Sequence, residues 1–193
     1  MNNLPSDELL VAQIKQGDQH SLDFLFRRYY RLLVLTAIKY VVDEFVAEEL
    51  VQDLFLNLWQ KRKTLAILGK IKTYLLVAIK NRCLNYLKTR FARQEFVEAT
   101  DCNLQTVQPH DCNGNAQILK EVIDQAISQL PDKCRCIFLL SRRAGMSYQE
   151  IADDLSLSKK TIEAQMGIAL KRLREFVNEY QNKLPSFKSS NKR

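Results

Sequence analysis

Residues 147–176 read SYQEIADDLSLSKKTIEAQMGIALKRLREF, and their apolar spacing decides the fold class. The segment predicts a short helix, a tight turn around Leu157 and a long helix that Ser158 can cap. The inward positions of the two helices are Ile151, Leu155, Ile162, Met166, Ala169 and Leu173. This pattern is typical of a helix-turn-helix. An ordinary antiparallel helix pair shares most of its features, and Ser156 stands where such turns often place glycine.

The second helix of this pair would present a basic face with small residues at its centre. On a helical wheel, Ala164 and Gly167 lie opposite the inward stripe, where their size would let the backbone sit deep in a major groove. Glu163 could accept a hydrogen bond from a cytosine amino group. The candidates for phosphate contact are Lys159, Lys160, Lys171, Arg172 and Arg174. For the two arginines, a solvated helix surface is the alternative.

Charge is distributed unevenly along the 193 residues, whose net charge is +7. Residues 1–53 hold 5 basic and 9 acidic side chains, a net of −4, whereas residues 54–94 hold 10 basic side chains and no acidic one. A solvated face usually mixes both signs. The acid-free segment therefore predicts a polyanionic partner, nucleic acid before membrane.

Within this segment, residues 71–90 read IKTYLLVAIKNRCLNYLKTR and predict a two-faced helix. Core candidates are Ile71, Leu75, Ala78, Ile79 and Leu87. The side chains expected to project outward are Lys72, Tyr74, Lys80, Asn81, Arg82, Asn85, Tyr86, Lys88 and Arg90. Basic groups follow phosphates and aromatic rings stack on unpaired bases, which suits single-stranded or partly melted nucleic acid. For both tyrosines, core packing is the alternative.

The preceding helix, AEELVQDLFLNLWQKR over residues 47–62, has a different character. Leu50, Leu54 and Leu58 suit one buried face. Phe55 and Trp59 are four residues apart and could pair on the surface beside acidic and polar neighbours. Because tryptophan is enriched at interface hot spots, this surface predicts a protein-docking face. The alternative is that Trp59 packs in the core.

Composition and the positions of glycine and proline indicate how the chain is divided into domains. Five glycines and four prolines in 193 residues favour long helices, so we expect an all-α chain of two small helical domains. The expected parts are a first domain over 1–90, a flexible linker over 91–115, a second domain over 116–182 and a basic tail over 183–193. The sequence shows neither a membrane-spanning apolar run nor a secretion signal, so we expect a cytoplasmic protein without stable membrane insertion.

Chemistry-bearing motifs are scarce. The five cysteines include no CxxC pair. Cys102, His110 and Cys112 could supply three metal ligands, but reduced cytosolic thiols are the better interpretation. There is no nucleophile–base arrangement, no phosphate-binding glycine-rich loop and no pair of metal-binding carboxylates. We therefore expect no enzyme activity, no metal and no cofactor.

Two stretches together resemble one family. Residues 47–62 followed by 71–90 are similar to the second conserved region of bacterial sigma-70 family sigma factors. Residues 127–175, from ISQLPDKCRC to KRLRE, are similar to their fourth region. The order, the short linker and the total length resemble the extracytoplasmic-function group, which keeps only these two domains. The resemblance implies a sigma factor that binds core RNA polymerase, recognises the −35 and −10 promoter elements and promotes melting.

The resemblance also implies a division of labour among residues. Docking on the β′ clamp helices of polymerase falls to Gln52, Asp53, Phe55, Leu56 and Trp59. Recognition and opening of the −10 element fall to Lys63, Lys70, Lys72, Tyr74, Lys80, Asn81, Arg82, Asn85 and Lys88. Recognition of the −35 element, near the polymerase β subunit, falls to Lys159, Lys160, Glu163, Ala164, Gly167, Lys171 and Arg172. The family often has Trp-Leu where Tyr74 and Leu75 stand, and an inhibitory anti-sigma factor is a further expected partner.

Two other functions compete with this interpretation. A stand-alone helix-turn-helix regulator of the GerE type would bind duplex DNA without polymerase, but the acid-free segment and the helix carrying Trp59 argue against it. A helical adaptor that binds polymerase and not promoter DNA would keep its function after its basic segment is neutralised. An enzyme is a distant third.

Overall fold

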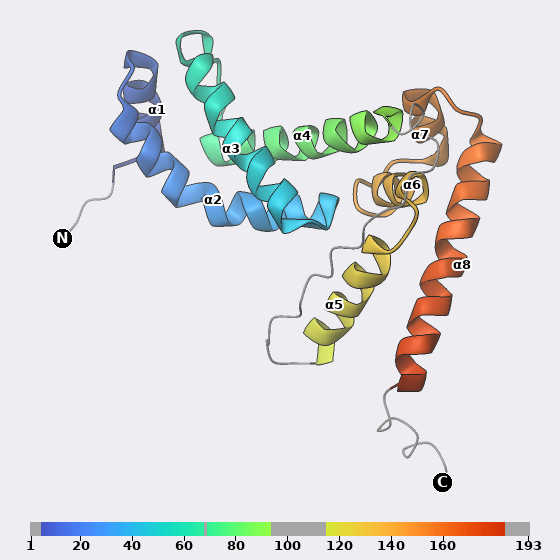
Figure 1. Ribbon diagram of the computed structural model, residues 1–193. Coiled ribbons are helices and arrows are strands. Elements are labelled where there is room, and N and C mark those ends of the chain that lie inside the picture. Colours follow the sequence, from blue (N-terminus) through green and yellow to red (C-terminus); the bar gives the residue numbers. More distant parts are fainter. Residues whose placement is uncertain (1–4, 68, 94–114, 184–193) are drawn as a thin grey trace. The chain divides into compact units, whose positions relative to one another are not determined.

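The computed structural model describes residues 5–67, 69–93 and 115–183 (Figure 1). These residues form eight α-helices and one short 3-10 helix, with no strand among them, which confirms the predicted all-α fold. The elements are α1 (Asp7–Gln16), α2 (Gln19–Val41), α3 (Glu44–Gln60), η1 (Arg62–Thr64), α4 (Ile71–Arg93), α5 (Asn115–Ser128), α6 (Asp132–Arg142), α7 (Tyr148–Leu155) and α8 (Lys159–Lys183). The chain divides into two compact units, residues 1–87 and 88–193.

Two residues separate each pair of consecutive helices from α1 to α3: Gly17 and Asp18, then Val42 and Asp43. Gly17 ends α1 in a left-handed conformation (φ +98°), and the Asp18 carboxylate then accepts from the backbone N–H groups of His20 and Ser21 at 3.1 Å. Val42 ends α2 with φ +59°, and Asp43 caps α3 by accepting from the N–H of Val46 at 3.1 Å. The third helix therefore begins at Glu44, three residues before the predicted start, because Asp43 is its cap.

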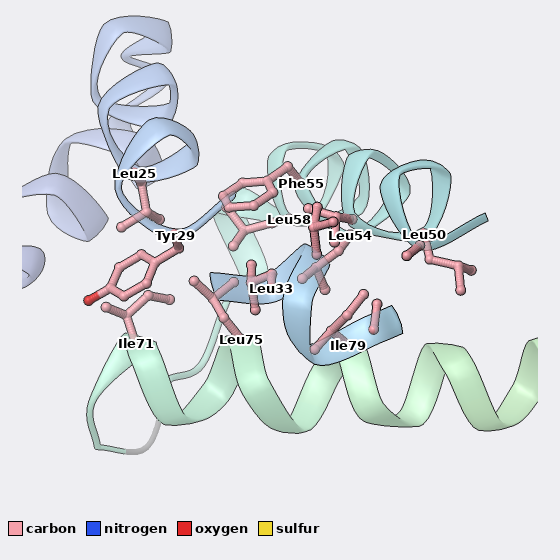
Figure 2. Close-up of a cluster of buried hydrophobic side chains, with 14 of the residues drawn as sticks. Leu25, Tyr29, Leu33, Leu50, Leu54, Phe55, Leu58, Ile71, Leu75 and Ile79 are labelled. Carbon is pink, nitrogen blue, oxygen red and sulfur yellow. The ribbon is translucent and has the colours of Figure 1, made fainter. Parts of the chain in front are cut away.

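The core of the first unit is formed by α1, α2, α3 and α4, with Leu10 and Ile14 coming from α1. Figure 2 shows side chains from α2, α3 and α4 pointing toward one another. Those labelled and buried are Leu25, Tyr29, Leu33, Leu50, Leu54, Phe55, Leu58, Ile71, Leu75 and Ile79. Each fully buried leucine or isoleucine contributes roughly 1.5–3 kcal/mol relative to exposure. The predicted core positions of residues 71–90 are confirmed, except that Ala78 is only half-buried.

Polar contacts fix α1 on α2. The hydroxyl of Tyr29 donates to Asp7 Oδ2, and the Arg28 guanidinium contacts the other Asp7 oxygen and donates to the carbonyl of Pro5 at 2.8 Å. Burial and the Asp7 hydrogen bond raise the pKa of Tyr29 to about 12. The phenol is therefore neutral over the physiological pH range and acts as a permanent donor to Asp7.

The second unit is built around α6. Nearly every α6 residue from Cys134 to Leu140 is buried, and α5, α6 and α7 all pack on α8. Arg143 joins the end of α6 to α5 through Asp124 at 2.7 Å. Cys83, Cys134 and Cys136 are free and buried. Burial raises the pKa of Cys83 to about 12 and raises the pKa of the other two thiols, so all three stay protonated.

Two other features are absent from the part of the chain that the structure describes. None of the described helices combines the length and apolar character needed to cross a membrane. Among the described residues, no three His, Cys, Asp or Glu side chains gather where they could hold a metal ion. Cys102, His110 and Cys112 lie outside the described residues, as do most of the predicted linker and the tail from residue 184.

Candidate nucleic-acid interface

The helix-turn-helix of α7 and α8 is closed by local hydrogen bonds. Ser147 and Glu150 form a reciprocal capping box at the start of α7, and the backbone N–H of Ser147 lowers the pKa of the Glu150 carboxyl. At the turn, Ser156 adopts φ +55°, and the N–H of Leu157 donates to the carbonyl of Ala152 at 2.9 Å. The turn thus takes the left-handed geometry usual for glycine, although a serine occupies it.

The long helix α8 begins where its predicted cap places it. Ser158 Oγ accepts from the N–H of Thr161 at 3.0 Å. Ile162, Met166 and Ala169 are buried as predicted, while Leu173 is half-buried. The residues predicted to face DNA are all exposed, namely Lys159, Lys160, Glu163, Ala164, Gly167, Lys171 and Arg172. The fold therefore leaves this face of α8 open for a ligand.

The centre of the exposed α8 face is flat. A methyl group added at Gly167 would meet no heavy atom within 4 Å, so nothing in the protein requires glycine there. Glycine in a helix interior costs about 1 kcal/mol relative to alanine. Two ion pairs, Lys159–Glu163 and Lys171–Glu175, lie on the same helix at 4.0 Å. Both are exposed, so their partners remain available to a ligand.

Helix α4 sorts its residues into four rows, each made of positions four apart. One row is entirely buried, and it consists of Ile71, Leu75, Ile79, Cys83, Leu87 and Phe91. The opposite row is entirely exposed and, from Thr73 to Thr89, uncharged: it consists of Thr73, Val77, Asn81, Asn85 and Thr89, before Arg93 ends the helix. We call this second set the exposed row. Val77 is its single aliphatic member and is 53% exposed.

Basic residues occupy the two remaining rows, one on each side of the exposed row. One flank carries Lys72, Lys80 and Lys88, and the other carries Arg82 and Arg90 together with Tyr74 and Tyr86. Lys72 is exposed, but the rest are half-buried. The expectation that all of these side chains project outward is therefore only partly met. Lysine and arginine bury their aliphatic stems while their charged ends reach outward. Lys88 is the first residue of the second unit, and its Nζ lies 2.6 Å from Oδ2 of Asp154 in the same unit.

Other predicted residues lie before or within this helix. Lys63 in η1 and Lys70 just before α4 are exposed, so cations precede the positive end of the α4 dipole. Tyr74 is half-buried and packs against the core cluster, as does Tyr86. Each ring therefore packs in part against the core, which was the alternative to base stacking for both tyrosines.

Helix α3 presents the predicted docking face with one correction. Gln52, Asp53 and Leu56 are exposed, Leu56 by 58%, and Trp59 is half-buried. Phe55 is only 4% exposed, so the prediction that it lies on the docking face and pairs with Trp59 is wrong. The physical reason is that α3 buries a second row, Ala47, Val51 and Phe55, besides the predicted leucine row.

Arg62 was counted among the cations of the acid-free segment, but its guanidinium is directed at Trp59. The Arg62 Cζ atom lies 4.3 Å from the centre of the Trp59 ring. Its Nη1 donates to the Trp59 carbonyl at 2.9 Å. The three-residue spacing of Trp59 and Arg62 across a helix end is a signal for such a contact. The charge pattern alone does not predict it, because it groups Arg62 with the other cations.

Two regions of the chain match family models, and its sequence is similar to those of several known proteins. Residues 25–92 match the family model Sigma-70 region 2, and residues 120–173 match Sigma-70, region 4. The RNA polymerase sigma factor NccH of Alcaligenes xylosoxydans xylosoxydans is 25% identical over 179 residues, covering 91% of this chain and 96% of the relative. The ECF RNA polymerase sigma-E factor of Haemophilus influenzae is 23% identical over 170 residues, covering 83% and 89%. The solved structure of CnrH in complex with the cytosolic domain of CnrY is 23% identical and covers 91% of this chain and 99% of that one, with a TM-score of 0.41.

The two matched regions, in this order and on both helical units, define the class of protein. The chain belongs to the sigma-70 family of RNA polymerase sigma factors. Its place within the family is the extracytoplasmic-function group, so it is a non-enzymatic, DNA-binding regulator that acts in transcription initiation. Matches to both regions favour this interpretation over a stand-alone regulator of the GerE type.

Proposed function

We propose that α3 docks on core RNA polymerase, that α8 reads the −35 element as duplex DNA, and that α4 holds the −10 element as it opens. The partners are the β′ clamp helices for α3, the β subunit near the second unit, and promoter DNA. The site of action is the cytoplasm, where polymerase and DNA are found. The domain limits of 1–90, 91–115 and 116–182 belong to this proposal.

The arrangement of α4 is the observation that carries the proposal for melting. An exposed row of uncharged side chains runs between two basic rows on a helix without any carboxylate. Phosphates of an opened strand can follow the cations on both flanks, while bases meet the amides, hydroxyls and methyl groups of the exposed row. Asn81 and Asn85 offer both donors and acceptors to base edges.

The α8 surface supports a different mode of binding. Its exposed face combines small residues at the centre with cations on the flanks. Small side chains permit close approach of the helix backbone to base edges, and flanking lysines contact phosphates. Ala164 can contact a thymine methyl group, and Glu163 can accept from a cytosine amino group. Affinity for the −35 duplex should therefore fall steeply as salt rises.

The α3 surface supports protein docking. Leu56 is exposed by 58% beside Gln52 and Asp53, and the half-buried Trp59 lies one turn further on. An exposed aliphatic group beside a tryptophan and an acid is the composition of an interface hot spot with a polar rim. Polymerase then supplies the covalent chemistry. This chain supplies binding energy that offsets the few kcal/mol lost for each unstacked base step.

An anti-sigma factor is the regulatory partner that we infer from the family. Such an inhibitor would bind between the two domains and separate them along the chain that joins them. Most of that chain, residues 94–114, lies outside the described residues. Inhibition would act by blocking the α3 face, the α4 face or both.

Charge reversal on α4 tests the proposal for melting. An Arg82→Glu variant places an acid beside the exposed row, and we expect it to keep core polymerase binding while open-complex formation, followed by permanganate reactivity of thymines, is lost. Arg31→Glu, a charge reversal at an exposed position of α2, is the matched control and should melt promoters normally. Normal melting by Arg82→Glu would remove α4 from the opening step.

A further inference from the structure

Arg62 makes two separate interactions with Trp59. The guanidinium lies over the indole ring with Cζ 4.3 Å from the ring centre. The same group donates a hydrogen bond from Nη1 to the Trp59 carbonyl at 2.9 Å. One side chain thus contacts both the ring and the backbone of the tryptophan at the end of α3.

The surroundings of Arg62 argue that it does not contact nucleic acid. Its side chain is half-buried, and Nε is buried without a hydrogen-bond partner among the described residues. A methyl group added at Gly17 would lie 4.0 Å from that Nε, so the end of α1 covers this side of the guanidinium. A phosphate-binding arginine needs its planar donor edge in solvent. In Arg62, Nη1 is instead directed at the Trp59 carbonyl and Nε is buried.

We propose that Arg62 is a positioning residue: it fixes the orientation of Trp59 so that α3 meets polymerase with its tryptophan already in place. This inference rests on the proposed docking of α3. Holding a large side chain before association removes part of the ordering cost of binding. The stacked cation adds that restraint to the partial packing of Trp59 against the core of the first unit.

The chain offers a direct spectroscopic readout because Trp59 is its only tryptophan. Arg62→Met keeps the length of the side chain but removes the cation and the donor. In the full-length protein we expect a changed emission maximum and increased acrylamide quenching of Trp59. Core polymerase binding should weaken about fivefold. Arg62→Lys keeps the charge but loses the planar donor edge, so it should fall between Arg62→Met and the native protein in both measurements.

Lys61→Met is the matched control, because Lys61 directly precedes Arg62, its side chain is exposed and it has no assigned contact with DNA or polymerase. We expect it to leave both Trp59 fluorescence and polymerase affinity unchanged. A double variant, Trp59→Ala with Arg62→Met, should bind polymerase no more weakly than Trp59→Ala alone, because the arginine acts through the tryptophan.

The outcomes separate this inference from the docking proposal. If Trp59→Ala weakens polymerase binding while Arg62→Met does not, Arg62 has no positioning role. Additive losses in the double variant, or weaker binding with unaltered Trp59 fluorescence, would contradict the inference in the same way. If Trp59→Ala binds normally, the docking assignment of α3 itself fails. Circular dichroism of each variant establishes that the helices are retained, and Arg62→Lys provides the test should Arg62→Met unfold.

Discussion

Phe55 of α3 packs against Phe26 of α2 with ring centroids 5.0 Å apart and an interplanar angle of 74°, an edge-to-face pair. Phe26 in turn contacts Tyr30 at 4.9 Å. The pair joins the two helices at the centre of the first unit and turns Phe55 away from the surface. Its neighbour Leu56 points outward. Adjacent residues of one helix therefore serve two functions, core packing and docking.

This pair predicts opposite effects for two neighbouring truncations. Phe55→Ala should lower the free energy of unfolding by about 3–5 kcal/mol, because it removes a buried ring. Leu56→Ala should change stability by less than about 0.5 kcal/mol but weaken core polymerase binding. Urea unfolding and a polymerase binding titration measure the two quantities. Equal stability losses, or normal polymerase affinity for Leu56→Ala, would contradict the division.

The error at Phe55 shows what helical periodicity leaves open. The leucines at 50, 54 and 58 correctly predicted one buried row of α3. The width of the buried face depends on how many neighbours a helix has, and α3 lies in a core that α2 and α4 also line. Its second buried row follows from that packing. Periodicity gives the direction of a buried face but not its width.

Gly167 predicts a separation of stability from DNA binding. Gly167→Ala should stabilise the second unit by up to about 1 kcal/mol, because the methyl group meets no atom and glycine disfavours helix. The same methyl group should weaken binding to a −35 duplex if the helix backbone approaches base edges closely. Thermal unfolding and fluorescence anisotropy with labelled duplex test both parts.

Asn178→Ala provides the control for Gly167→Ala, since it improves helix propensity at an exposed α8 position eleven residues further along. It should stabilise α8 modestly and leave duplex affinity unchanged. Unchanged affinity in Gly167→Ala as well would show that the groove does not need a flat surface at this position.

Val77 is the aliphatic member of the exposed row of α4, and we expect an acid there to repel an opened strand. Val77→Asp should leave stability and polymerase affinity nearly unchanged while lowering the open-complex equilibrium about tenfold, equivalent to about 1.4 kcal/mol. Leu35→Asp on α2 is a control of equal exposure, 52% against 53%. An equal loss of melting in both variants would indicate a general effect of added negative charge.

Tyr29 predicts an alkaline weakness of the first unit. Its pKa rises from 10.0 to about 12 on folding, chiefly through burial and then through the Asp7 hydrogen bond. The raised pKa favours the folded state fully below pH 10, and that contribution is lost as pH rises through 12. Native protein should therefore lose more stability between pH 10 and 12 than Tyr29→Phe, as measured by urea unfolding. Parallel declines would contradict this, because Tyr29→Phe leaves every other side chain in place.

Local signals predicted the helix ends well, whereas the division of labour on α4 needed the structure. Ser158 caps α8 as predicted, and Ser6 and Gly17 occupy the two ends of α1 by the same kind of local chemistry. The absence of acids in residues 54–94 predicted an anionic partner, but it does not distinguish one cation of this segment from another. Burial decides that Arg62 is directed at Trp59 and that Lys72 is open to solvent. The exposed row appears only when burial is known for each turn of the helix.

The most direct test of the central claim is transcription by core RNA polymerase and this protein from a pool of random promoters, with the starting templates sequenced. The account predicts initiation from templates that share two elements, an upstream duplex element whose selection changes in Glu163→Gln and a downstream element whose opening fails in Arg82→Glu. Polymerase binding without initiation would contradict it and favour the adaptor, and duplex binding without polymerase binding would favour a stand-alone regulator.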